Sequence, residues 1–174
     1  MAPRRFNYLF LAMAALLLLL AAESPSVDAQ TDIGVNPWCR TASAKRLCTR
    51  MVTGATNWRD ASINALRSTL KHAKRLRGRI HLVRPAIAGL GKTSQDSIMA
   101  SCNNNFDGTI DDLEKSLRAL EDEDIGPVRS RLRAAQRSEC EAALSEFRVR
   151  SPLARYSKLL SMEVNNCLAV ILQT

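Results

Sequence analysis

The chain contains few of the residues on which most enzymes and metal sites depend. Its 174 residues include only two histidines, His72 and His81, and aromatic residues make up only 5%. Two histidines leave little room for histidine-based catalysis or for a histidine-rich metal site. The H-E-x-x-H, G-x-S-x-G, phosphate-loop and G-x-G-x-x-G motifs are also missing from the sequence. These absences predict a protein that is not an enzyme and that holds no metal or cofactor.

Glycine, proline and cysteine are also scarce. Seven glycines and six prolines exclude a collagen-like or proline-rich low-complexity chain. Five cysteines are too few for a dense disulfide scaffold, so an apolar core must supply most of the stability. The apolar share of 46% is too high for a disordered chain. The length then suits one domain preceded by a removable leader.

The first 29 residues have the parts of a secretory signal peptide. Arg4 and Arg5 precede an uninterrupted apolar run over residues 9–22, and small residues end the segment at Ala29. The apolar run has about 14 residues, whereas a membrane-spanning helix needs about 20. We therefore predict cleavage after Ala29 and a secreted mature domain, residues 30–174, that does not span a membrane.

The rest of the chain has the periodicity of amphipathic helices. Apolar residues recur at intervals of three or four, and no segment shows sustained alternation with period two. Four such stripes occur, over residues 60–83, 94–120, 127–147 and 153–171.

These stripes predict an all-α protein. Four long helices joined by short polar loops favour an antiparallel four-helix bundle over residues 60–173. Residues 33–52 come before it and contain two cysteines nine positions apart. We expect them to form a short helical hairpin extension, closed by a disulfide bond.

Secretion would place the five cysteines in an oxidising compartment, where several arrangements of two bridges are open. A bridge between Cys39 and Cys48 would close a short loop, and one between Cys102 and Cys140 would join two bundle helices. Cys167 lies on an inward-facing stripe, where a free thiol behaves as a small apolar residue. Its alternative is an intermolecular bridge. The cysteine spacing does not favour zinc, because no C-x-x-C pair is present.

The charge is basic and unevenly distributed. The formal net charge is +8, with basic residues concentrated at 40–84 and acidic residues at 103–124. The two segments could form ion pairs across a helix interface, or the basic one could face an anionic partner. Nucleic acid is disfavoured by secretion and by the lack of aromatic residues among the charges. The basic row of the first helix consists of Arg67, Lys71, Arg75 and Arg79.

The order of these features resembles the plant invertase and pectin methylesterase inhibitor family. A signal peptide is followed by a C-x8-C pair and then by a bundle with one cysteine in each of two adjacent helices. The similarity covers nearly the whole mature chain. The segments that carry it are Cys39–Cys48, Ser101–Phe106, Ser138–Glu141, Ser151–Leu153 and Val164–Ala169.

The resemblance implies a fold, two bridges and a role. The bridges would be Cys39–Cys48 and Cys102–Cys140, which would leave Cys167 free. The role would be inhibition of a pectin methylesterase or an acid invertase in the apoplast, or in the vacuole. Invertase inhibitors carry Pro-Lys-Phe where this chain has Glu-Asp-Ile at 123–125, which favours pectin methylesterase.

The sequence is also compatible with other functions. The Glu-Cys-Glu and Ser-Pro-Leu segments are more similar to the invertase inhibitors, so invertase is the alternative target. A secreted helical signalling ligand and a cationic protein that binds the wall or a membrane are further alternatives, since each could be a small disulfide-bonded bundle.

The resemblance also suggests a contact surface. In these inhibitors the later bundle helices supply most of the contact with the enzyme. Many plant wall pectin methylesterases are basic, so an acidic surface is the better electrostatic match. The basic row would then face wall polyanions or solvent. The expected contact residues are Asp107, Asp111, Asp112, Glu121, Asp122, Glu123 and Asp124.

Overall fold

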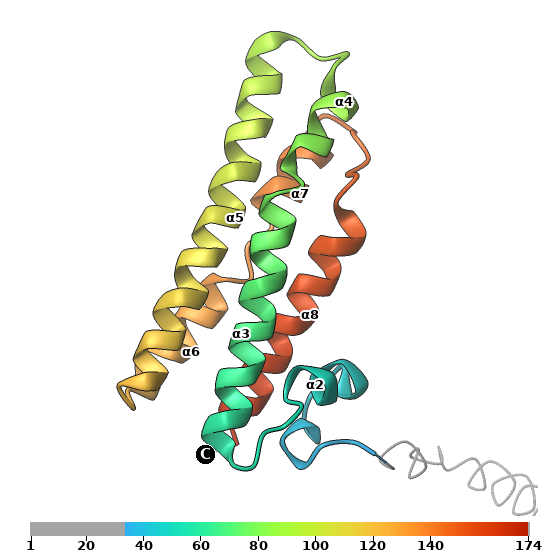
Figure 1. Cartoon of the computed structure of the whole chain (residues 1–174). Helices are drawn as coiled ribbons and strands as arrows, with labels where there is room; N and C mark the ends of the chain where they lie inside the picture. Colours follow the sequence, from blue (N-terminus) through green and yellow to red (C-terminus); the bar gives the residue numbers. More distant parts are fainter. Residues whose placement is uncertain (1–33, 174) are drawn as a thin grey trace, which may run out of the picture. The chain divides into compact units, whose positions relative to one another are not determined.

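The structure, a computed structural model, describes residues 34–173, and within that range it contains helices and no strands. The predicted leader, residues 1–29, lies outside the described residues. The elements are two 3-10 helices, η1 (Pro37–Cys39) and η2 (Ile80–Leu82), and the α-helices α2 (Lys45–Met51), α3 (Trp58–Arg77), α4 (Val83–Ile87), α5 (Lys92–Glu121), α6 (Ile125–Ala134), α7 (Glu139–Glu146) and α8 (Ala154–Ile171) (Figure 1).

Three long helices and one broken helix form the bundle, which confirms the predicted fold class. Helix α3 packs against both α5 and α8, and α6 and α7 together make the fourth limb against α5 (Figure 1). The apolar stripes face inward, and Leu66, Leu76, Leu113, Leu132 and Val164 are fully buried. Burial of each such side chain stabilises the fold by about 1.5–3 kcal/mol.

Helix α3 ends earlier than the apolar stripe predicts. Its first turn is capped by Asn57, whose side-chain oxygen accepts a hydrogen bond from the backbone N–H of Asp60 at 2.9 Å. The helix stops at Arg77, and the chain bends after Gly78 into η2 and α4. Ile80 and Val83 remain buried on these short helices. The stripe over residues 60–83 therefore marks one buried face that three elements share.

The N-terminal extension is attached to the second half of α8. A disulfide bond joins Cys39 at the end of η1 to Cys48 in α2. The fully buried Asn166 donates to the backbone oxygen of Ala44 at 3.2 Å and accepts from the backbone N–H of Ala44 at 3.4 Å. The indole N–H of Trp58 donates to the backbone oxygen of Val170 at 3.0 Å. These contacts fix the extension and the start of α3 to the same helix.

Across residues 34–173, the helices are too polar or too short to cross a membrane.

Candidate docking surface

A second disulfide bond joins α5 to the fourth limb. It links Cys102 with Cys140, and both residues are buried. The sequence pattern predicts one helix over residues 127–147 with Cys140 near its middle, and this prediction is wrong. The limb is broken into α6 and α7, and Cys140 lies in the first turn of α7.

Two polar side chains of α5 account for the break. Asn105 accepts a hydrogen bond from the backbone N–H of Cys140 at 3.1 Å, and the Thr109 hydroxyl donates to the backbone oxygen of Ala135 at 3.4 Å. The end of α6 and the start of α7 both leave backbone groups that need partners. Since α5 supplies partners at both ends, the linker over residues 135–138 can be non-helical and still be held in place.

Asn105 and Thr109 belong to a buried polar row that the sequence analysis missed. The row repeats at intervals of four, three and four along α5, so it follows the helix period as the apolar stripe does. Its members are Asn105, Thr109, Asp112 and Ser116.

Replacing Asn105 by alanine is expected to lower the free energy of unfolding by about 1–3 kcal/mol, because the buried N–H of Cys140 loses its partner. Asn104→Ala is the matched control, since Asn104 is the neighbouring residue on the same helix and is exposed. Its effect should stay within about 0.5 kcal/mol. Urea denaturation of both variants measures the difference. Equal effects at the two positions would contradict a capping role for Asn105.

Arg137, within the linker, forms a third contact with α5. Its guanidinium lies 2.9 Å from the carboxylate of Asp112 and 3.7 Å from that of Glu139. The hydrogen bond with Asp112 raises the pKa of Arg137 above its ordinary value. Gly108 makes room for this pair, because a Cβ on Gly108 would lie 2.9 Å from the Arg137 Nε.

Asp112 is therefore not available as an outward-facing contact residue, contrary to the sequence-based expectation. Its side chain is only 11% exposed and is already paired with Arg137. The charge of Asp112 holds the linker in place and does not lie on the outer face of α5.

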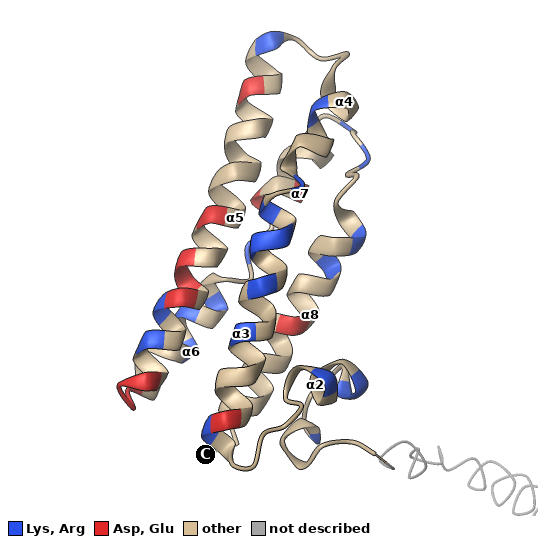
Figure 2. Ribbon diagram, viewed as in Figure 1, with Lys and Arg blue, Asp and Glu red and all other residues tan. Residues whose placement is uncertain are grey.

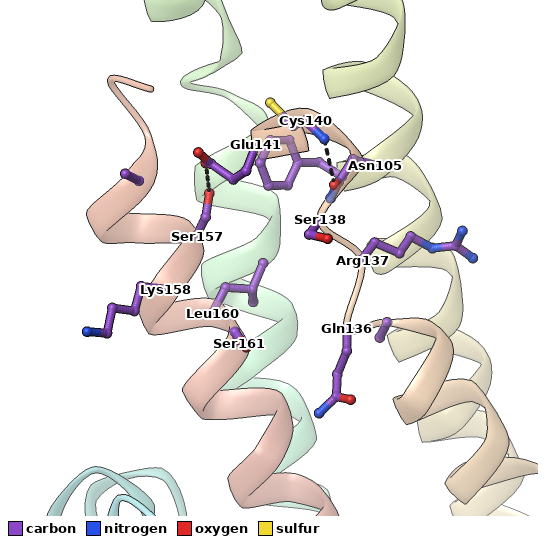
Figure 3. A pocket seen from close by; sticks show the side chains of 13 residues that line it. Asn105, Gln136, Arg137, Ser138, Cys140, Glu141, Ser157, Lys158, Leu160 and Ser161 are labelled. Carbon is purple, nitrogen blue, oxygen red and sulfur yellow. Dashed lines mark hydrogen bonds between the residues drawn. The ribbon is translucent and has the colours of Figure 1, made fainter. Parts of the chain in front are cut away.

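A groove of about 280 Å³ lies between this linker and α8 (Figure 3). Figure 3 shows Gln136, Arg137 and Ser138 on the linker side, and Ser157, Lys158 and Ser161 on α8. Its apolar lining includes the buried Phe106 and Leu160. The groove thus combines an apolar lining with polar side chains on either side.

Hydrogen bonds across the groove fix its width. The Glu141 carboxylate of α7 accepts from the hydroxyl of Ser157 at 2.8 Å (Figure 3). It also accepts from the hydroxyl of Ser151 at 3.0 Å. On the linker, the Gln136 amide donates to the side-chain oxygen of Asn165 on α8. The two sides of the groove are therefore connected near both α7 and the linker.

Three of the seven predicted acidic contact residues, Asp107, Glu121 and Glu123, pair with basic residues of α3, and so does Glu114. Figure 2 shows acidic positions along α5 beside basic positions of α3. The pairing across the helix interface, one of the two interpretations of the charge distribution, is thus present. The pairs are Asp107 with Arg77 at 2.6 Å, Glu114 with Lys74 at 2.7 Å, Glu121 with Arg67 at 3.8 Å and Glu123 with Arg59 at 2.6 Å.

Of the other predicted acidic contact residues, Asp111 lies within α5, and Asp122 and Asp124 follow its C-terminal end. Asp111 pairs with Lys115 within α5 at 2.5 Å, and the hydrogen bond from Lys115 is the main reason why the pKa of Asp111 is lowered. The charge of Arg131 on α6 contributes to the same shift. Asp122 and Asp124 are exposed in the turn between α5 and α6.

The structure leaves Cys167 unpaired and buried. Its sulfur lies 3.2 Å from the hydroxyl of Thr69 on α3. Burial raises the pKa of the thiol to about 12. In the part of the chain that the structure describes, no three cysteine, histidine or carboxylate side chains are grouped as metal ligands would be.

The fold and this groove define a class of protein, an all-α bundle whose helices are cross-linked by disulfide bonds. Residues 34–170 match the sequence profile described as plant invertase/pectin methylesterase inhibitor. The chain belongs to this family of inhibitors, which confirms the resemblance inferred from the sequence.

Solved structures of the same fold include two inhibitors. A mutant form A of a pectin methylesterase inhibitor from Arabidopsis has a TM-score of 0.63 and 16% identity, covering 78% of this chain and 93% of that chain. A pectin methylesterase inhibitor from Arabidopsis thaliana has a TM-score of 0.55 and 18% identity, and the match covers 78% of this chain and 91% of that chain. At these identities the likeness shows the fold alone. A comparison with curated protein sequences gave no match.

Proposed function

We propose that this chain inhibits a pectin methylesterase by docking the linker over residues 135–138 and the adjacent face of α8 against the enzyme's substrate cleft. The observation that carries the proposal is the fixed linker beside a groove with an apolar lining and polar sides. The family and the two similar inhibitor structures support the kind of function. The missing Pro-Lys-Phe motif favours pectin methylesterase over invertase as the target.

A prearranged surface suits inhibition. Binding costs free energy when loops and side chains become ordered, and a linker already held by a disulfide bond and by Asn105, Thr109 and Asp112 avoids much of that cost. A pocket with a desolvated apolar centre and a polar rim is the usual place for the strongest contacts of a protein interface. The groove of Figure 3 would receive a side chain of the enzyme.

The acidic residues have a secondary role in this proposal. Asp111, Asp122 and Asp124 would form a rim that attracts a basic enzyme and mainly raises the association rate. Asp107, Glu121 and Glu123 would contribute less, because they are engaged with α3. The proposal also includes secretion into the apoplast, through the leader predicted at residues 1–29.

The target can be tested by titrating the purified protein against a pectin methylesterase and an acid invertase in parallel. We expect stoichiometric loss of methylesterase activity and unchanged invertase activity. Loss of invertase activity alone would assign the alternative target. If neither enzyme responds and both disulfide bonds are intact, the proposed function is wrong and a signalling or wall-binding role takes its place.

The docking face can be tested by a charge placed in the groove. Ser161→Arg should weaken methylesterase inhibition by about 30-fold or more, which corresponds to the roughly 2 kcal/mol of a strong interface contact. Ser97→Arg is the control, because Ser97 is also an exposed helical serine but lies near the start of α5, outside the groove. It should inhibit as the unmodified protein does. Inhibition constants that change equally in both variants would place the contact elsewhere.

A further inference from the structure

A second groove, of about 450 Å³, lies between α3 and α8 and shares no lining residue with the docking groove. Figure 2 shows the basic positions of α3 next to α8. The residues that line this basic groove are Ser68, Lys71, His72, Arg75, Leu76, Arg79, Tyr156, Leu159 and Glu163.

Within residues 34–173, no acidic side chain forms an ion pair with the exposed basic residues of this groove. The basic residues Arg67, Lys74 and Arg77 are paired with acids of the α5 segment. Lys71 and Arg75 make no ion pair or side-chain hydrogen bond within residues 34–173. They are one helical turn apart on α3, so the two like charges repel each other, and no acid among these residues offsets the repulsion. An anionic ligand would offset that repulsion.

The nearest acid does not cancel these charges. Glu163 is the acidic residue that lines the groove, but its carboxylate lies 2.8 Å from the Nδ1 of His72 and its side chain is only 9% exposed. The carboxylate is therefore turned toward the histidine and the protein interior. Lys71 and Arg75 remain the groove's exposed charges on α3.

Arg79 continues the row and is held in a defined orientation. Its guanidinium carbon lies 4.4 Å from the ring centroid of Tyr156, a cation–π contact. Stacking fixes the plane of the guanidinium while its N–H groups stay free to bind a carboxylate in a bidentate manner. Tyr156 is 39% exposed, and Leu159 beside it is also exposed. The groove therefore has an apolar strip next to its basic row.

We propose that this basic groove binds a linear polyuronate, an acidic polysaccharide with a carboxylate on each sugar. Lys71 and Arg75 are about 6 Å apart along the axis of α3. Arg79, just past the end of α3, lines the same groove, so three basic residues line it and it is not a single-anion site. A sugar ring also presents a C–H face that can lie on Tyr156 and Leu159. An acidic polypeptide supplies the charges without that rigid apolar face.

The proposal can be tested by the retardation of the disulfide-intact protein in gels containing de-esterified polygalacturonate. The double variant Lys71→Gln/Arg75→Gln should bind about 10-fold more weakly, as expected for the loss of two exposed charge contacts. Arg46→Gln/Arg50→Gln is the matched control, since it removes the same charge from exposed positions on α2. The control should bind within a factor of about two of the unmodified protein.

Further measurements distinguish binding at the groove from non-specific electrostatic attraction between the polyanion and the basic protein. Tyr156→Ala should weaken binding although it changes no charge, and added salt should weaken binding of the unmodified protein. Fully methyl-esterified polygalacturonate should not bind. Equal losses in the two double variants would overturn the groove, and poly-glutamate binding as tightly as polygalacturonate would overturn the polysaccharide assignment. No target enzyme is used, so these outcomes are independent of the proposed inhibition.

Discussion

Replacing Cys102 and Cys140 together by alanine is expected to lower the free energy of unfolding by about 4 kcal/mol. The bridge spans 38 residues, and in the chain-entropy model a closed loop of this length restricts the unfolded chain by about that amount. The bridge also holds the start of α7 against α5, where Asn105 accepts from Cys140. The double substitution avoids leaving a reactive free thiol. Urea denaturation followed by circular dichroism gives the value.

The bridge between Cys39 and Cys48 provides the comparison. It spans nine residues, so the same model predicts a smaller loss of about 3 kcal/mol for Cys39→Ala/Cys48→Ala. The two variants should also differ in inhibition, because only the loss of the Cys102–Cys140 bridge releases the linker at the docking groove. An unchanged denaturation midpoint for the Cys102/Cys140 variant would show that the α5–α7 bridge does not stabilise the protein.

Phe106→Ala is the second substitution with a large expected effect. Phe106 is only 2% exposed and is among the largest fully buried side chains in residues 34–173. Its truncation should cost about 3–5 kcal/mol, because the transfer of the ring from water is lost and a cavity remains. Phe106 also lines the docking groove, so inhibition should weaken even where the variant is still folded.

Phe147→Ala is the matched control for this substitution. Phe147 follows α7 and is 37% exposed, so the same truncation leaves little cavity and should cost much less than Phe106→Ala. Thermal unfolding of the two variants under identical conditions makes the comparison. Similar melting temperatures would mean that the ring of Phe106 is not packed as the structure shows.

The sequence predicts the long helices well because each helix is stabilised by burying a single apolar face. The stripes over 60–83, 94–120 and 153–171 correspond to α3 with its short continuation, to α5 and to α8. An apolar face repeating every three or four residues has few other ways to be buried in one domain. The bundle therefore follows from periodicity and loop length.

The break in the fourth limb could not be predicted in this way. The stripe over 127–147 is weak, and the linker is held by side chains of another helix. Asn105 and Thr109 form hydrogen bonds with Cys140 and Ala135 only once α5 is packed beside the ends of α6 and α7, and a local sequence pattern does not contain that packing. The available indication was a polar row at helical spacing along α5, which is unusual for the inner face of a bundle.

The sequence shows which segments carry the basic and the acidic residues, but it does not show which residues form ion pairs. A count of charges suggests that the first helix and the acidic segment attract each other, and the Arg77–Asp107 and Lys74–Glu114 pairs agree with that. The count cannot show that Asp112 points inward to Arg137, since the partner lies 25 residues further along the chain. Nor can it show which basic residues remain unpaired beside α8.

The burial of Cys167 limits what this thiol can do to the two bridges. Thiol–disulfide exchange requires a thiolate that can reach a sulfur of the bond it attacks. Burial raises the pKa of the Cys167 thiol well above its ordinary value, so the thiol stays protonated at neutral pH, and its sulfur lies within the core beside Thr69. An odd number of cysteines is therefore compatible with two stable disulfide bonds. Once α3 and α8 have packed together, the thiol of Cys167 cannot reach either bond to exchange with it.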